Sequence, residues 1–69
     1  MPNVANYFLH RAFAYKILNK PELALRDCKK ALQIEPGNKK GIQLLQRIHL
    51  MMGNTRLAEL TLLYAYSNA

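Results

Sequence analysis

The chain has 69 residues, and ten Lys and Arg against four Asp and Glu give it a formal net charge of +6. A chain of this length supports one domain at most, with a thin core. Hydrophobic residues make up 51% of it, yet no apolar run reaches the roughly 18 residues of a membrane-spanning helix, and Arg11, Lys16 and Lys20 interrupt any secretory-signal pattern. The composition therefore predicts a cytoplasmic or nuclear protein that has no membrane partner.

The first predicted element is a helix over about residues 3–18, with Asn3 as its N-terminal cap. Phe8, Ala12 and Tyr15 follow one another at i, i+4 and i+7, so they share one face of this helix. A small residue between two aromatic residues lets a second helix approach closely. This face is therefore expected to pack on the next helix.

Asn19 and Pro21 mark a turn and the start of a second helix. Asn tolerates the left-handed conformation in which helices often end, and proline suits a first helical position, where its missing N–H is not needed. The second helix is predicted from Pro21 to about Glu35, because Pro36 and Gly37 stop it. One of its faces carries small residues, which are Ala24, Cys28 and Ala31. The lone cysteine is expected to be buried there, because it has no second cysteine for a disulfide or a zinc site.

The third and fourth helices follow the same plan. Asn38 is a plausible cap for a helix over residues 39–52, and Gly53 is expected to end it in the left-handed conformation. A fourth helix is predicted from Asn54 or Thr55 to about residue 66. Its packing face is expected to consist of Ala58, Leu62 and Ala65. Leucines and tyrosines on its other sides predict that a further helix covers it.

The chain resembles itself at a shift of 34 residues, which places Ala24 on Ala58 and Ala31 on Ala65. In its length and in the positions of its small residues, this unit resembles the tetratricopeptide repeat family. Residues 5–38 correspond to repeat one and fit that pattern well, whereas residues 39–69 fit loosely as repeat two.

The resemblance implies an all-α fold of two antiparallel helix-turn-helix hairpins, stacked as a fragment of an α-solenoid. Each repeat of a solenoid is stabilised only by its neighbours, and two repeats are fewer than usually fold alone. Residues 1–69 are therefore expected to form a single segment of a longer array, with neighbouring repeats of the same full-length chain among its partners.

The sequence gives little support for catalysis or for metal binding. His10 and His49 fall on different predicted helices, and Cys28 is expected in the core. The four acidic residues show no pairing suited to general acid–base catalysis. We therefore expect a non-catalytic protein with no cofactor and no metal, in which His49 has a packing role.

The resemblance also implies where a partner binds, because the first helices of tetratricopeptide repeats line a concave groove. At the corresponding positions of the two repeats this chain carries apolar, aromatic and basic side chains. These suit a protein or peptide segment with an acidic or C-terminal carboxylate element. The candidate peptide-binding residues are Asn6, Leu9, His10, Phe13, Lys16, Lys40, Gln43 and Arg47, with Leu44 and Leu50 at the two remaining positions.

The stretches HRAFAY, ALRDCKKAL and KKG resemble a subgroup of tetratricopeptide repeats found in chaperone co-factors. Members of that subgroup grip the terminal carboxylate of a chaperone tail with an Asn, a Lys and an Arg. Here His10, Lys40 and Leu44 stand at those three positions, so the carboxylate clamp is not intact.

Two alternatives to peptide binding stay open. The basic residues could bind RNA, although they form no dense run and no RNA-binding signature. Alternatively, the segment is purely structural, and adjacent repeats cover all its faces.

Overall fold

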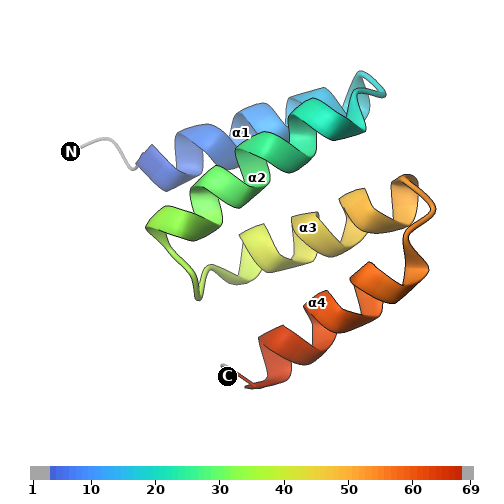
Figure 1. The fold of residues 1–69 in the computed structure, drawn as a ribbon. Helices are drawn as coiled ribbons and strands as arrows, with labels where there is room; N and C mark the ends of the chain where they lie inside the picture. The colour runs from blue at the N-terminus through green and yellow to red at the C-terminus, as the bar shows by residue number, and fades with distance from the viewer. Residues whose placement is uncertain (1–3, 68–69) are drawn as a thin grey trace.

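The computed structural model describes the backbone of residues 4–67 and the side chains of residues 4–64. This part of the chain forms four helices, which are α1 (Val4–Ile17), α2 (Pro21–Ile34), α3 (Lys39–Met51) and α4 (Thr55–Ser67). They follow one another as two antiparallel hairpins, α1 with α2 and α3 with α4 (Figure 1). The predicted fold is confirmed, while the predicted cap Asn3 lies outside the described residues.

The same turn closes both hairpins, 34 residues apart. In the first, Asn19 has a φ of 59° and its N–H donates to the carbonyl of Lys16 at 3.1 Å. In the second, Gly53 has a φ of 77° and its N–H donates to the carbonyl of Leu50 at 3.0 Å. In both turns the next N–H reaches back five residues, which completes a Schellman motif. The left-handed helix ends predicted from the sequence are confirmed.

The core lies where α1, α2 and α3 meet. Each helix contributes small or branched side chains that are almost completely buried, and Phe8 and Tyr15 pack against them from α1. Alanine and cysteine at these positions let the helices approach closely, while the larger side chains fill the space around them. The buried cluster consists of Ala5, Leu9, Ala12, Ala24, Cys28, Ala31, Leu44 and Ile48.

The packing face of α4 differs from the prediction at one position. Ala58 is buried as expected, but Leu62 is 41% exposed, and Thr61 is the buried neighbour at 8%. The Thr61 hydroxyl donates to the carbonyl of Leu57 at 2.8 Å, so its polar group is satisfied within the helix. The side chain of Ala65 lies outside the described residues.

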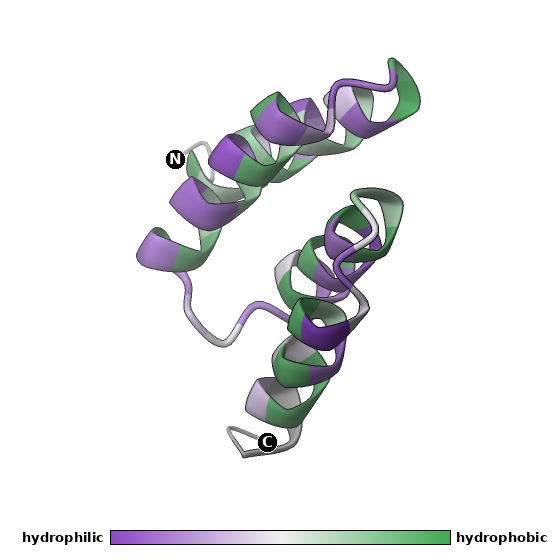
Figure 2. Ribbon diagram, turned by 45° about the vertical axis from the view of Figure 1, so that its right-hand side comes forward, coloured by the Kyte–Doolittle hydropathy of each residue, from purple (hydrophilic) through white to green (hydrophobic). Residues whose placement is uncertain are grey.

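Much of the apolar surface of α4 faces away from the core. Leu57, Leu60, Leu63 and Tyr64 are all exposed. Green segments recur along α4 in Figure 2, which marks its many hydrophobic residues. No helix within residues 4–67 is long and apolar enough to cross a lipid bilayer.

Candidate functional site

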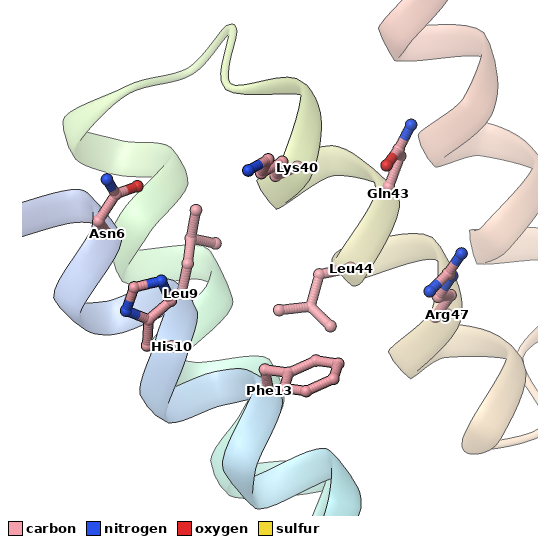
Figure 3. A pocket seen from close by; sticks show the side chains of 8 residues that line it. All are labelled: Asn6, Leu9, His10, Phe13, Lys40, Gln43, Leu44 and Arg47. Atoms are coloured by element: carbon pink, nitrogen blue, oxygen red, sulfur yellow. The ribbon is translucent and has the colours of Figure 1, made fainter.

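A pocket lies between α1 and α3, the first helices of the two hairpins. These helices run in the same direction (Figure 1), so their N-terminal ends lie at one end of the pocket and their C-terminal ends at the other. The pocket has a volume of about 390 Å³, within the range of small-ligand sites. Its lining residues, shown in Figure 3, are Asn6, Leu9, His10 and Phe13 from α1 and Lys40, Gln43, Leu44 and Arg47 from α3.

Leu9 and Leu44 form the apolar floor of the pocket. Both side chains are buried and belong to the core cluster, so the floor is continuous with the packing between the helices. Gly41 sits directly behind this floor. A Cβ atom at Gly41 would lie 2.9 Å from Leu32 Cδ2 and 3.3 Å from Leu9 Cδ2, so the missing side chain permits the close approach of α3.

Phe13 provides the aromatic wall of the pocket and is 49% exposed. The Nζ atom of Lys16 lies 5.7 Å from the centroid of the Phe13 ring, within the range of a cation–π contact. Lys16 is half-buried and does not line the pocket itself. Its role in the structure is therefore to cover one face of the ring that does.

The charges that line the pocket are all positive. Lys40 and Arg47 are exposed on α3, and no Asp or Glu is among the lining residues. The helix geometry spaces these two cations by about 10 Å along α3, since each residue advances the helix by about 1.5 Å. The two cations of such a site can attract an anionic group, and its floor can contact an apolar part of the same ligand.

Residues 5–38 match the family model of the tetratricopeptide repeat. The match covers α1, α2 and the turn that follows them, which is the span predicted for repeat one. Residues 5–38 are therefore similar to a tetratricopeptide repeat. Neither curated proteins nor solved structures include a match to the chain. Tetratricopeptide repeats generally mediate protein–protein interactions and are typically non-catalytic.

The second hairpin lies outside the matched range and shares two features with the first. It ends its first helix with the same turn and buries Ala58 where repeat one buries Ala24. His49 is buried at the position that Tyr15 holds in repeat one, so its predicted packing role is confirmed. Burial, together with the charge of Lys29, lowers the pKa of His49.

Asn38 joins the tetratricopeptide repeat to α3. Its Oδ1 atom accepts a hydrogen bond from the backbone N–H of Gly41 at 3.0 Å, and its Nδ2 donates to Oε1 of Glu35 at 2.9 Å. The cap predicted from the sequence is confirmed. It fixes the first turn of α3 and thereby positions Lys40 beside the pocket.

A hydrogen bond from Cys28 also links α2 to the first turn of α3. Its Sγ donates to the carbonyl of Gly41 at 3.2 Å, from α2 to the start of α3. The side chain is buried as predicted, and burial raises the pKa of the Cys28 thiol to about 12. The thiol therefore serves packing, and it is far from the reactive thiolate form.

The sequence did not predict an ion pair between α1 and α2 in which a half-buried Arg11 meets the buried Asp27. Arg11 donates from Nε to Oδ2 of Asp27 at 2.6 Å and from Nη2 to Oδ1 at 2.9 Å. Its Nη1 donates to the hydroxyl of Tyr7 at 2.9 Å. The hydrogen bonds from Arg11 lower the pKa of Asp27, which is buried. None of these three residues lines the pocket, so the pair holds α1 on α2 from outside the site.

Seven of the eight candidate residues from the sequence line this one pocket, and Lys16 lies beside it. Leu50, at the last of the groove positions, is exposed and does not line the pocket. Among the described residues no group of three or more His, Cys, Asp or Glu could hold a metal ion. The structure thus brings the candidate residues together, and peptide binding by them stays a prediction.

Proposed function

We propose that this chain is a protein-interaction module that holds an acidic peptide segment of a partner in the groove between α1 and α3. The observation that carries the proposal is the pocket itself, which combines a buried leucine floor and an exposed phenylalanine with two cations and no acidic side chain. Apolar contacts provide affinity in such a site, and convergent charges select the ligand.

The proposed ligand carries side-chain carboxylates, because the groove departs from the clamp pattern of the chaperone co-factor subgroup. Leu44 is buried in the floor at the position where that pattern has an arginine, and His10 stands where it has an asparagine. Recognition of the acidic groups therefore rests on Lys40 and Arg47, both of which are exposed on α3.

The test is an NMR titration of the 69-residue chain with an acidic peptide that contains leucine or phenylalanine. We expect shifts of the backbone amides of α1 and α3, and a weaker affinity in the double variant Lys40→Gln/Arg47→Gln. The matched control is Lys29→Gln/Lys30→Gln, which removes the same charge from exposed positions on α2. It should bind the peptide as the unaltered chain does.

The same two variants separate peptide binding from RNA binding. A nucleic acid that binds through the overall positive charge should bind more weakly as the salt concentration rises. Either double variant should weaken its binding about equally, because each removes two positive charges. An acidic peptide in the groove responds only to Lys40→Gln/Arg47→Gln. Amide shifts confined to α2 and α4, or equal loss of affinity in both variants, would reject the groove as the binding site.

A further inference from the structure

One side of α4 exposes a row of mostly apolar side chains. We call it the outer face; it consists of Leu60, Leu63 and Tyr64, with Arg56 at its N-terminal end. These residues follow one another at i, i+4, i+7 and i+8, so they share one side of the helix. The three apolar side chains are 47–60% exposed. Among the described helices α4 packs only on α3, so no other described helix covers the outer face.

The equivalent face of α2 is cationic. At a shift of 34 residues from Leu60, Leu63 and Tyr64, the first hairpin has three exposed cations, which are Arg26, Lys29 and Lys30. Charged side chains at these positions of the first hairpin are well solvated. The second hairpin instead exposes apolar groups there, which is unfavourable in water unless another surface covers them.

A following repeat of the array would not cover the outer face. In the first hairpin, Cys28 contacts the next hairpin, because its Sγ donates to the carbonyl of Gly41 on α3. The equivalent residue of α4 is Leu62, which points to a different side of the helix from Leu60 and Leu63. Continuation of the array therefore accounts for the exposure of Leu62, and the outer face needs a different partner.

The distribution of charge favours a second copy of this chain as that partner. Two copies repel each other, since each has a net charge of +6. The helix α4 carries one cation, Arg56, and one anion, Glu59, and so has no net charge, whereas α1, α2 and α3 are each positively charged. Two copies therefore approach each other with least repulsion through α4. An acidic segment, in contrast, is attracted to the other helices.

The two ends of α4 make the outer face complementary to itself. A helix has a partial positive charge at its N-terminus and a partial negative charge at its C-terminus. In α4 no acidic residue stands in the first turn and no basic residue in the last, so neither charge is compensated within the helix. If a two-fold axis passes midway between Leu60 and Leu63 of an antiparallel pair, Arg56 of each copy lies opposite residue 67, where α4 of the other copy ends.

We propose that α4 is a dimerisation surface, on which the outer faces of two copies of this chain pack in antiparallel orientation. Leu60 of each copy packs on Leu63 of the other. No residue that lines the groove belongs to α4, so the dimer presents two open grooves and could hold two segments of one partner. Because the groove and the outer face are separate, this inference does not depend on the proposed function.

The size of the outer face sets the expected affinity. A stable interface takes roughly 20–30 residues from each side, and the outer face is much smaller. The dimer should therefore be weak, with a dissociation constant on the order of 0.1–1 mM. Added salt should strengthen it, because salt screens the repulsion between the two positively charged copies. Binding of an acidic peptide or of RNA responds to salt in the opposite direction.

Sedimentation equilibrium of the 69-residue chain tests the dimer. The average mass should rise toward twice that of the monomer with increasing concentration. The variant Leu60→Arg/Leu63→Lys gives α4 the cations that α2 has at the equivalent positions, so it should keep its helices by circular dichroism and associate at least about tenfold more weakly. The matched control is Ile17→Arg/Leu18→Lys, which adds the same charge at exposed positions of the first hairpin. At high salt it should associate as the unaltered chain does.

A spin label on Thr55→Cys tests the orientation, because Thr55 is exposed at the start of α4. The labelled chain is mixed with an isotope-labelled, otherwise unaltered chain, so that only contacts between copies are observed. The label should broaden the amide signals of residues 64–67 more than those of residues 55–58. The opposite pattern would reject the antiparallel pair.

Three results would overturn the dimer itself. The first is a monomer mass at about 1 mM in high salt, ten times the lower end of the expected dissociation constant. The second is equal weakening by the two double variants, which would mean that association does not involve the outer face. The third is a larger effect of Leu62→Lys than of Leu60→Arg/Leu63→Lys, which would place the contact on the side of α4 that faces a following repeat.

Discussion

Two glycines in turns of this chain should respond to alanine in opposite directions. Gly53 ends α3 with a φ of 77°, whereas Gly37, between α2 and α3, has no positive φ. A Cβ atom at either position would meet no atom within 4 Å, so crowding does not distinguish them. The comparison of Gly53→Ala with Gly37→Ala therefore isolates the cost of the left-handed backbone.

The expected magnitudes follow from two opposing effects. Alanine reduces the conformational entropy of the unfolded chain, which stabilises the native state by about 0.4–1 kcal/mol where the backbone permits it. In the left-handed region alanine costs about 1–2 kcal/mol. Gly37→Ala should therefore raise the free energy of unfolding by about 0.5 kcal/mol, and Gly53→Ala should lower it by about 1 kcal/mol.

Thermal unfolding followed by circular dichroism at 222 nm measures the difference. For a domain of this size 1 kcal/mol corresponds to about 4–8 °C in Tm, so the two variants should be separated by roughly 6–12 °C. Asn19→Gly provides a further check, because Asn19 occupies the equivalent turn with a φ of 59° and glycine should be tolerated there without loss. Equal Tm values for the two alanine variants would refute the assignment of the Gly53 turn.

Three further predictions concern titratable groups. The ionised Asp27 carboxylate stabilises the native state at neutral pH, because its pKa is lower in the native than in the unfolded chain. This stabilisation should disappear as the pH falls below about 4. Urea titrations across that range should show a smaller loss of the free energy of unfolding in Asp27→Asn than in the unaltered chain. The depressed pKa of His49 means that the unfolded chain binds the proton more readily, so stability should fall as the pH drops below about 6.5, an effect removed in His49→Leu but kept in His10→Gln. The Cys28 thiol, with a pKa of about 12, should react with a disulfide reagent at a rate that rises with urea, as unfolding exposes it; fast reaction of the native protein would contradict its burial.

The helices and their ends could be predicted because their signals are local. Pro21 starts α2, Asn38 caps α3 and Gly53 ends it, and each of these residues acts through its own backbone or a neighbour within a few positions. The lining of the pocket could also be predicted, because the resemblance to the tetratricopeptide repeat implies which positions of the two first helices face the groove.

Contacts between distant residues could not be predicted in the same way. Arg11 and Asp27 are 16 positions apart, and nothing in the sequence shows that the carboxylate of Asp27 is buried beside the Arg11 guanidinium. The error in α4 has a similar origin. Thr61 and Leu62 follow Ala58 at i+3 and i+4, and both spacings fit one face, so hydrophobicity alone favoured the leucine. The hydrogen bond from Thr61 to Leu57 removes the cost of burying the hydroxyl.

The glycine behind the pocket floor gives the groove an adjustable dimension. The start of α3 rests at position 41 against the ends of the Leu32 and Leu9 side chains. A Cβ atom there would displace these side-chain ends by a few tenths of an ångström, and Leu9 belongs to the pocket floor. A change at position 41 would therefore reach the pocket floor from behind and leave the exposed cations Lys40 and Arg47 in place.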